Sequence, residues 1–219
     1  MQIAIDGPAG AGKSTVAREV AAQLGFKYLD TGAMYRAIGV ALADAGIDTA
    51  DGAAVTDALP SVEMKVEFDG DSQKVCVNGQ DMTGRIRSPE AAMQASSVAA
   101  FPGVRDKLVE LQRRTAAGYD IIMDGRDIGS YVLPDADYKF YLTASPRARA
   151  ERRRRDLLRL GQDVSEEEIE AEIRRRDAQD MHREYAPLRQ APDQVLIDTT
   201  AMSQQEAAAE ILRIVRGQA

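Results

Sequence analysis

The segment Gly7-Pro8-Ala9-Gly10-Ala11-Gly12-Lys13-Ser14 fits the pattern G-x-x-x-x-G-K-[ST] of a phosphate-binding loop. An apolar run at residues 1–5 precedes it and predicts a strand, while Val16, Val20 and Leu24 recur behind it at helical spacing. The pattern is informative between a strand and a helix, because the helix then directs its N-terminal dipole at the bound phosphates. The sequence therefore predicts a nucleoside triphosphate as a ligand.

In a loop of this kind the backbone N–H groups surround the phosphates, Lys13 reaches the β- and γ-phosphates, and the Ser14 hydroxyl ligates Mg²⁺. The alternative is that Gly7, Gly10 and Gly12 are turn glycines in front of an ordinary helix. The loop alone leaves open which molecule accepts the phosphate.

The composition limits the size and class of the protein. With 219 residues, 44% of them hydrophobic, the chain can bury one sizeable core with small attached subdomains. It has no apolar run of about 18 residues that could span a membrane, and Asp6 interrupts the N-terminal apolar stretch too early for a signal peptide. The single cysteine, Cys76, excludes an internal disulfide. We expect a soluble, cytoplasmic protein without a membrane partner, and nothing in the sequence demands more than a monomer.

The charges are unevenly distributed. The formal net charge of −7 argues against a nucleic-acid binder. Residues 140–189 nevertheless hold 12 of the 22 arginines and no lysine, with an unbroken run at 152–155. A guanidinium suits bidentate phosphate binding, so we expect some of these arginines to face a polyphosphate. The alternative for several of them is a solvated helix face with ion pairs.

Short apolar runs alternate with helical segments along the chain. The predicted strands are Met1–Ile5, Phe26–Leu29, Asp120–Met123, Tyr138–Leu142 and Gln194–Ile197. This alternation predicts an α/β fold, a P-loop three-layer sandwich whose parallel sheet has helices on both faces. Helix starts are predicted at Ser88 and Ser145, each before a proline, and at Ser165 and Ser203, each three residues before a glutamate.

Two regions depart from this rhythm. Residues 62–68 alternate apolar and polar side chains, and Val75 and Val77 resume the pattern after a turn, which predicts a small antiparallel sheet with one wet face. This sheet is either an insertion without a role in binding or a subdomain that encloses a second substrate.

The second region consists of two strongly charged helices within residues 146–183, which meet at residues 160–163. Their few apolar positions indicate a lid.

Carboxylates and arginines follow the predicted strands, where ligands of parallel sheets bind. Asp124 is positioned to hold a Mg²⁺-bound water, the alternative being a cap on the turn at Gly125. Arg126 and Asp127 come next, one suited to a phosphate and the other to a base edge.

A second polar segment, residues 30–36, also follows a predicted strand. Thr31 and Arg36 can receive an acceptor phosphate at a helix N-terminus, the alternative being a capped helix with Arg36 in solvent. The single histidine, His182, is interpreted as an exposed surface residue in a charged helix. A phosphate acceptor needs no general base.

These motifs together resemble the bacterial cytidylate kinase family. The resemblance is carried by Gly7 through Thr15, by Asp30-Thr31-Gly32-Ala33-Met34-Tyr35-Arg36, by Asp124-Gly125-Arg126-Asp127-Ile128-Gly129, and by shorter matches at residues 99–105, 176–183 and 186–188. It implies a nucleoside monophosphate kinase fold with a five-stranded parallel core, a lid, and a monophosphate-binding subdomain that contains the antiparallel insert.

The resemblance also implies an activity, the transfer of the γ-phosphoryl group of ATP to CMP or dCMP with Mg²⁺. The expected ATP-binding residues are Gly7, Pro8, Ala9, Gly10, Ala11, Gly12, Lys13, Ser14, Thr15 and Arg152. The expected CMP-binding residues are Thr31, Arg36, Ser96, Arg105, Arg126, Asp127, Arg176, Asp180 and Arg183. The expected catalytic residues are Lys13, Arg126, Arg153 and Arg176, and the metal is expected at Ser14 and, through water, at Asp124. Arg149 also matches a lid arginine of the family.

We expect one kinase domain over residues 1–219. Its core is placed at residues 1–35, 86–150 and 184–219, the monophosphate-binding subdomain at 36–85, and the lid at 151–165 with a following helix at 166–183. One alternative is a P-loop kinase of UMP, AMP or a hydroxylated acid. The other is a nucleotide switch, which predicts a guanine-reading Asn-Lys-x-Asp motif that this sequence lacks.

Overall fold

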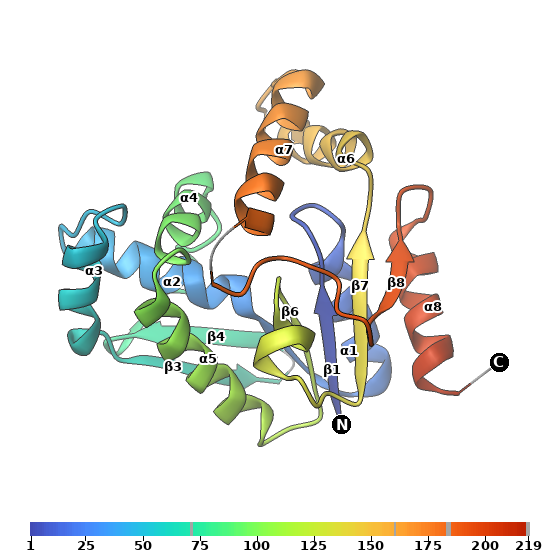
Figure 1. The fold of residues 1–219 in the computed structure, drawn as a ribbon, viewed down its shortest axis with the longest axis horizontal. Helices are drawn as coiled ribbons and strands as arrows, with labels where there is room; N and C mark the ends of the chain where they lie inside the picture. The colour runs from blue at the N-terminus through green and yellow to red at the C-terminus, as the bar shows by residue number, and fades with distance from the viewer. Residues whose placement is uncertain (71, 160, 183–184, 218–219) are drawn as a thin grey trace. The chain divides into compact units, whose positions relative to one another are not determined.

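The computed structural model describes residues 1–70, 72–159, 161–182 and 185–217 (Figure 1). Its strands are β1 (Gln2–Asp6), β2 (Lys27–Asp30), β3 (Met64–Asp69), β4 (Ser72–Val77), β5 (Gln80–Asp81), β6 (Ile121–Asp124), β7 (Tyr138–Thr143) and β8 (Val195–Asp198). Its α-helices are α1 (Lys13–Leu24), α2 (Thr31–Asp44), α3 (Gly52–Ala58), α4 (Pro89–Val98), α5 (Pro102–Ala116), α6 (Pro146–Arg159), α7 (Glu166–His182) and α8 (Gln204–Val215). A 3₁₀ turn, η1 (Leu59–Ser61), and a π turn, η2 (Ile128–Val132), complete the elements of the described residues.

The main sheet has five strands in the order β2-β6-β1-β7-β8. β1 pairs in parallel with β7, and β7 pairs in parallel with β8. Ile3, Ala4 and Ile5 are fully buried, as expected for a strand that is covered on both faces and therefore reads as a continuous apolar run. The predicted five-stranded parallel sheet is confirmed, and the observed strand ends lie within one residue of the predicted ones.

The chain divides into two compact units, and the first comprises Met1–Gly25 and Ile122–Ala219. Within it, α1 packs against α8, and α6 packs against α7. The α6–α7 pair has a small apolar cluster of its own, made by Ala150, Leu157 and Ile169. The two predicted charged helices are therefore present and share a small apolar core of their own. Their role as a lid stays a prediction.

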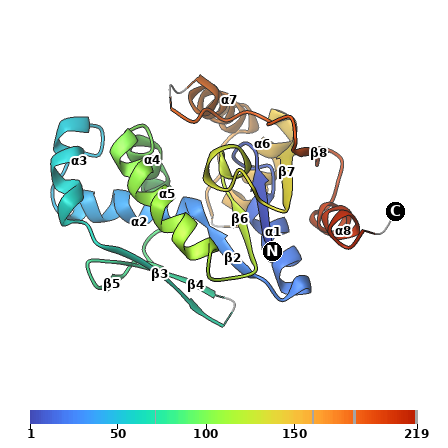
Figure 2. The same ribbon diagram turned by 60° about the horizontal axis from the view of Figure 1, so that its bottom comes forward.

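The second unit comprises Phe26–Ile121 and contains the three-stranded sheet β3-β4-β5 (Figure 2). β3 and β4 pair antiparallel, with Met64 opposite Val77. Met64 and Val77 are buried while Lys65 and Glu67 are exposed, so the predicted sheet with one wet face is confirmed. The helix α2 packs against β4 and α4, and a Cβ at Gly39 would lie 2.9 Å from the Cβ of Gln94 at the α4 contact.

The predicted helix caps are formed as expected. The side chains of Ser88 and Ser145 accept hydrogen bonds from the backbone N–H groups of Ala91 and Ala148. Ser165 and Ser203 each exchange hydrogen bonds with the glutamate three residues later. Local side-chain chemistry thus sets where four of the helices begin.

Among the described residues, the helices are all too short or too polar to cross a membrane.

Candidate active site

The phosphate-binding loop lies between β1 and α1 in the first unit. Gly7, Gly10 and Gly12 have φ values of 141°, 76° and 91°, a region of backbone conformation that favours glycine. A Cβ at Gly7 would also lie 1.9 Å from the carbonyl oxygen of Leu142 in β7. The loop therefore approaches the neighbouring strand so closely that a side chain at its first position does not fit.

We expect Gly7→Ala to lower the free energy of unfolding by more than about 3 kcal/mol, since positive φ costs an alanine about 1 to 3 kcal/mol and the methyl overlaps a carbonyl in addition. Urea denaturation followed by circular dichroism measures the loss. The matched control is Gly25→Ala, where φ is 69° but no atom lies within 4 Å of the added methyl. Equal losses in the two variants would contradict the close approach at Gly7.

Lys13 begins α1 and turns back over the loop. Its Nζ donates a hydrogen bond to the carbonyl oxygen of Pro8 at 2.8 Å, and the residue is only 5% exposed. Burial, assisted by the nearby charge of Arg126, lowers the pKa of Lys13 to about 7, against the attraction of Asp124. An ammonium group is thus held inside the loop, in a place where further negative charge would stabilise it.

Ser14 and Asp124 come from positions 110 residues apart and meet at the end of the sheet. The Ser14 hydroxyl donates a hydrogen bond to Oδ2 of Asp124 at 2.8 Å. The N–H of Gly125, the next residue, donates to the carbonyl oxygen of Ile5 at 3.0 Å. The metal-linked role of Asp124 stays a prediction.

This oxygen pair suits Mg²⁺, which prefers few protein ligands and takes the rest from phosphates and water. The described residues contain no group of three or more acidic, histidine or cysteine side chains that could hold a metal by themselves.

Arg126 follows β6 and reaches α7. Its Nε donates to Oδ2 of Asp180 at 2.8 Å, with both side chains about one-fifth exposed. Burial acts to lower the pKa of the Arg126 guanidinium, but the carboxylates of Asp180 and Asp124 outweigh it and the net shift is upward. The residue keeps its positive charge close to the phosphate loop's lysine.

Arg149 connects the α6–α7 pair to the phosphate loop. It is 3% exposed, and its Nη1 donates to the carbonyl oxygen of Ala9 at 2.9 Å and to Oδ1 of Asp177 at 3.0 Å. Arg152 makes a second, indirect connection through Thr199, whose Oγ1 donates to the carbonyl oxygen of Ala11 at 3.1 Å. Two arginines of α6 are thus tied to backbone of the loop.

In the second unit, Asp30 and Arg36 lie at the start of α2. Asp30 caps this helix by accepting from the N–H of Ala33 at 2.9 Å, and its other oxygen accepts from Nη2 of Arg36 at 2.8 Å. Thr31 is buried beside them. The helix is capped, as the alternative expected, and the partly exposed guanidinium of Arg36 is held beside the helix N-terminus by Asp30. The binding of an acceptor phosphate here stays a prediction.

Arg105 of α5 lies deep in the same unit. It is 2% exposed, and its guanidinium carbon lies 5.9 Å from the centre of the Tyr35 ring, within cation–π range. Ser96 is exposed on α4.

Comparison with known proteins now decides the family. A family model described as "Cytidylate kinase" matches residues 3–217. The chain belongs to the cytidylate kinase family. The cytidylate kinase of Carboxydothermus hydrogenoformans is 46% identical over 98% of this chain and 97% of its own, and that of Symbiobacterium thermophilum is 48% identical over 98% and 95%.

Among solved structures, an uncharacterized protein from Eubacterium ventriosum is similar with a TM-score of 0.52 at 10% identity, and covers 100% of this chain and 99% of that one. This similarity concerns the fold alone. The predicted membership of the cytidylate kinase family is confirmed by the family match and the relatives.

The remaining predicted residues lie in varied surroundings. Asp127 is buried after β6, Arg176 is half-buried in α7, and Thr15 and Arg153 are exposed on α1 and α6. Arg183 lies outside the described residues. His182 is exposed, as predicted.

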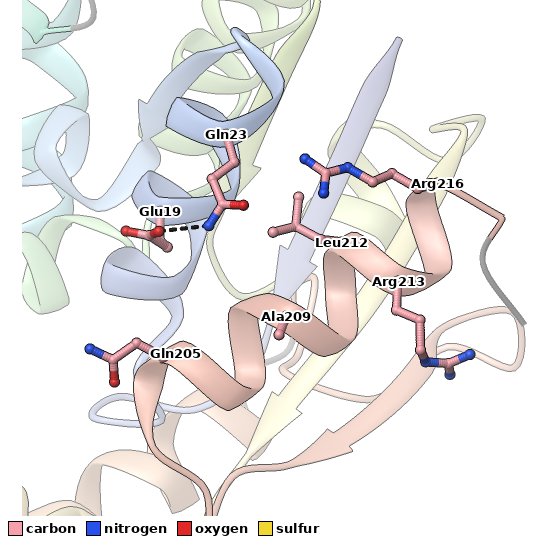
Figure 3. Close-up of a pocket in the computed structure, with 7 residues that line it drawn as sticks. All are labelled: Glu19, Gln23, Gln205, Ala209, Leu212, Arg213 and Arg216. Atoms are coloured by element: carbon pink, nitrogen blue, oxygen red, sulfur yellow. Dashed lines mark hydrogen bonds between the residues drawn. The ribbon is translucent and has the colours of Figure 1, made fainter.

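A hollow of about 290 Å³ lies between α1 and α8, away from these residues (Figure 3). Its lining is Glu19, Gln23, Gln205, Ala209, Leu212, Arg213 and Arg216. None of them is a predicted site residue, and Glu19 and Gln23 hydrogen-bond each other at 2.7 Å. The hollow is therefore not part of the candidate active site.

Three residues that touch the site were not predicted: Asp6, Asp177 and Thr199. Asp177 and Thr199 bind α6 arginines, and Asp6 binds the segment after Asp127. Asp6 had a visible signal, since it ends a predicted strand directly before the phosphate loop, and Asp177 lies in the matched segment 176–183. Thr199 had none.

Proposed function

We propose that this protein is an ATP-dependent kinase that transfers the γ-phosphoryl group of ATP to CMP or dCMP, giving ADP and CDP or dCDP. The observation that carries the donor half is the phosphate loop with Lys13 inside it and the Ser14–Asp124 hydrogen bond at its end. Membership of the cytidylate kinase family supports the acceptor.

On the donor side, we assign the ATP phosphates to the loop of residues 7–15, through backbone N–H groups other than at Pro8, which has none, and to Lys13. Ser14 would hold Mg²⁺ directly and Asp124 would hold it through a water molecule, consistent with their 2.8 Å contact. When bound, Mg²⁺ would supply positive charge that offsets the charge of the phosphates. Arg152 and Arg153 are assigned to the donor phosphates as lid arginines.

On the acceptor side, the roles are assigned residue by residue. Thr31, Arg36, Arg126 and Arg176 would bind the phosphate of CMP; Ser96, Arg105 and Asp127 would read cytosine; and Asp180 and Arg183 would approach the sugar. Asp127 can accept from the N4 amino group of cytosine, whereas uracil presents an acceptor, O4, at the same place. A carboxylate facing O4 would be left unpaired, which favours cytosine.

The chemistry that follows needs no covalent intermediate and no general base. The attacking group is already a phosphate oxyanion, and catalysis of phosphoryl transfer consists mainly of alignment and charge stabilisation. Lys13, Arg126, Arg153 and Arg176 are the cations assigned to the migrating group.

We further propose that residues 151–165 act as a lid, that residues 36–85 form a monophosphate-binding subdomain, and that the enzyme works as a cytoplasmic monomer. The private apolar cluster of α6 and α7 supports the lid, because a pair of helices with its own core can move as one body.

The proposed acceptor is tested with a panel. Purified protein with Mg²⁺ and ATP is supplied with CMP, dCMP, UMP, AMP or a hydroxylated acid, and ADP formation is measured. We expect CMP and dCMP to give the highest kcat/KM. A higher value with UMP, AMP or the acid would overturn the cytosine assignment, and ADP formation that is independent of any acceptor would favour a nucleotide switch.

A further inference from the structure

Asp6 is the last residue of β1, and the proposed chemistry assigns no role to its side chain. Its side chain is fully buried and accepts three hydrogen bonds. The donors are the backbone N–H of Ile128 at 2.6 Å, the backbone N–H of Gly129 at 2.8 Å, and the Nε2 of Gln194 at 2.6 Å. All three are uncharged groups, and all three lie more than 120 residues away along the chain.

The two backbone donors open the π turn η2. The N–H groups that begin a helical turn have no partner inside the turn, so they need an acceptor from elsewhere. Asp6 supplies it, and the carbonyl oxygen of Asp127 in turn accepts from Tyr131 at 2.9 Å and Val132 at 3.1 Å. The π turn is thus held at its start by a carboxylate of β1. Turns of the π type are rare.

The neighbours of Asp6 along the chain indicate what this contact does. Gly7, the next residue, opens the phosphate loop, while Arg126 and Asp127 immediately precede the π turn. Asp6 is therefore joined to the donor loop by the main chain and to the acceptor-reading segment by its side chain. We infer that Asp6 is a positioning residue that holds Arg126 and Asp127 in place for the acceptor, an inference that rests on the proposed function.

A carboxylate is suited to this task only when it is ionised. Three donors surround it, so a protonated oxygen would face a donor and one hydrogen bond would be lost. Burial raises the pKa of Asp6 to about 6, and the charge of Asp127 adds to the rise, while the three hydrogen bonds oppose it. The charge of Asp6 also acts on two other titratable groups, Lys13 and Tyr141, and tends to raise the pKa of each. The contact is therefore complete at pH values well above 6 and weakens as the pH falls through about 6.

The test compares Asp6→Asn with the matched control Asp137→Asn. Asp137 also accepts a backbone N–H of β1, from Gln2 at 2.6 Å, but at the other end of the strand and at the surface. We expect Asp6→Asn to lower kcat/KM for CMP by about 10- to 100-fold at pH 8, the size of effect that follows from misplacing a binding group by a fraction of an ångström to an ångström. A loss no larger than that of Asp137→Asn would overturn the inference.

The pH profile separates positioning by an ionised group from a merely structural role. Asparagine does not titrate, whereas the phosphate of CMP titrates near pH 6 with both enzymes. The ratio of wild-type to Asp6→Asn activity therefore cancels the titration of CMP and reports the charge of Asp6, including its effect on Lys13. We expect this ratio to shrink as the pH falls from 8 to 5. A ratio that does not change with pH would overturn the inference.

A measurement on the wild-type protein covers the case in which Asp6→Asn does not fold. Hydrogen exchange of the Ile128 and Gly129 amides is followed from pH 7 to pH 5 and compared with the Gly125 amide, which donates to the carbonyl oxygen of Ile5 at 3.0 Å. We expect the protection of Ile128 and Gly129 to fall relative to Gly125, and constant relative protection would overturn the inference. Exchange needs no substrate. Failure of the proposed function would instead appear as a wild-type enzyme that does not phosphorylate CMP.

Discussion

Replacing Arg126 by alanine is expected to lower kcat with CMP by about 10³-fold or more, the lower end of what arginine contacts contribute to phosphoryl transfer. The reason is that Arg126 is a permanently charged donor beside Lys13, held by Asp180 at 2.8 Å, so its charge needs no reorganisation when charge develops on the transferred group. The loss is measured by ADP formation at saturating ATP and CMP.

The matched control for this variant is Arg85→Ala. Arg85 also pairs with an aspartate, Asp44, at 2.6 Å, but in the second unit and with both side chains nearly half exposed. We expect this variant to keep nearly all of its activity, since exposed ion pairs contribute at most about 1 kcal/mol to stability. If Arg126→Ala retained turnover comparable to Arg85→Ala, the assignment of Arg126 to the transferred group would be abandoned.

Thermal unfolding separates this catalytic loss from a loss of structure. Removing Arg126 leaves the partly exposed carboxylate of Asp180 without that partner, which destabilises the protein but far less than a fully buried charge would. We therefore attribute a large loss of turnover in a variant that still unfolds cooperatively to missing charge at the reaction centre.

The main sheet was predictable because its signals are local. Each strand is a short apolar run next to a turn or a helix start, and Ser88, Ser145, Ser165 and Ser203 cap helices through hydrogen bonds that reach only three residues. The hairpin likewise depends on alternation within a few residues. Such signals do not require knowledge of the distant chain.

The contacts within the site were predictable only where a sequence motif specifies which residue types lie together. The phosphate-loop pattern calls for a carboxylate at the end of another strand, and the structure brings Ser14 and Asp124 together across 110 residues. No pattern links Asp6 to Ile128, or Arg152 to Thr199, because these contacts exist only after the strands have assembled. The π turn after Asp127 also has no composition signal, since its shape depends on the acceptor that Asp6 supplies.

The same limit explains why the role of Arg149 was not resolved from sequence. A run of arginines at helical spacing indicates which face of α6 is charged, but not which members meet a carboxylate. The structure buries Arg149 against Asp177 and leaves Arg153 exposed. Burial of a long cation is a property of packing, and spacing within one helix does not contain it.

Replacing Lys13 by methionine is expected to lower kcat/KM for ATP by about 10²- to 10³-fold, the loss typical of removing one preorganised donor to developing charge. Methionine keeps the length of the side chain and removes the ammonium that Lys13 holds inside the loop, 2.8 Å from the Pro8 carbonyl oxygen. Burial disfavours this charge, as the lowering of the pKa of Lys13 to about 7 indicates, so the variant is expected to unfold at the same or a higher temperature at pH 7. Activity would then fall without a loss of stability, which misfolding does not produce.

The chain offers a closely matched control in Lys139→Met. Lys139 also bonds the carbonyl oxygen of a proline five residues earlier, Pro134, and adds an ion pair with Asp193 at the surface. It lies in β7, outside the phosphate loop. Because the two variants lose the same group and a similar backbone contact, the difference in their kcat/KM for ATP isolates the contribution of a cation inside the loop. Comparable activity in the two variants would show that the loop does not use its lysine on the phosphates, and would remove the donor half of the proposed mechanism.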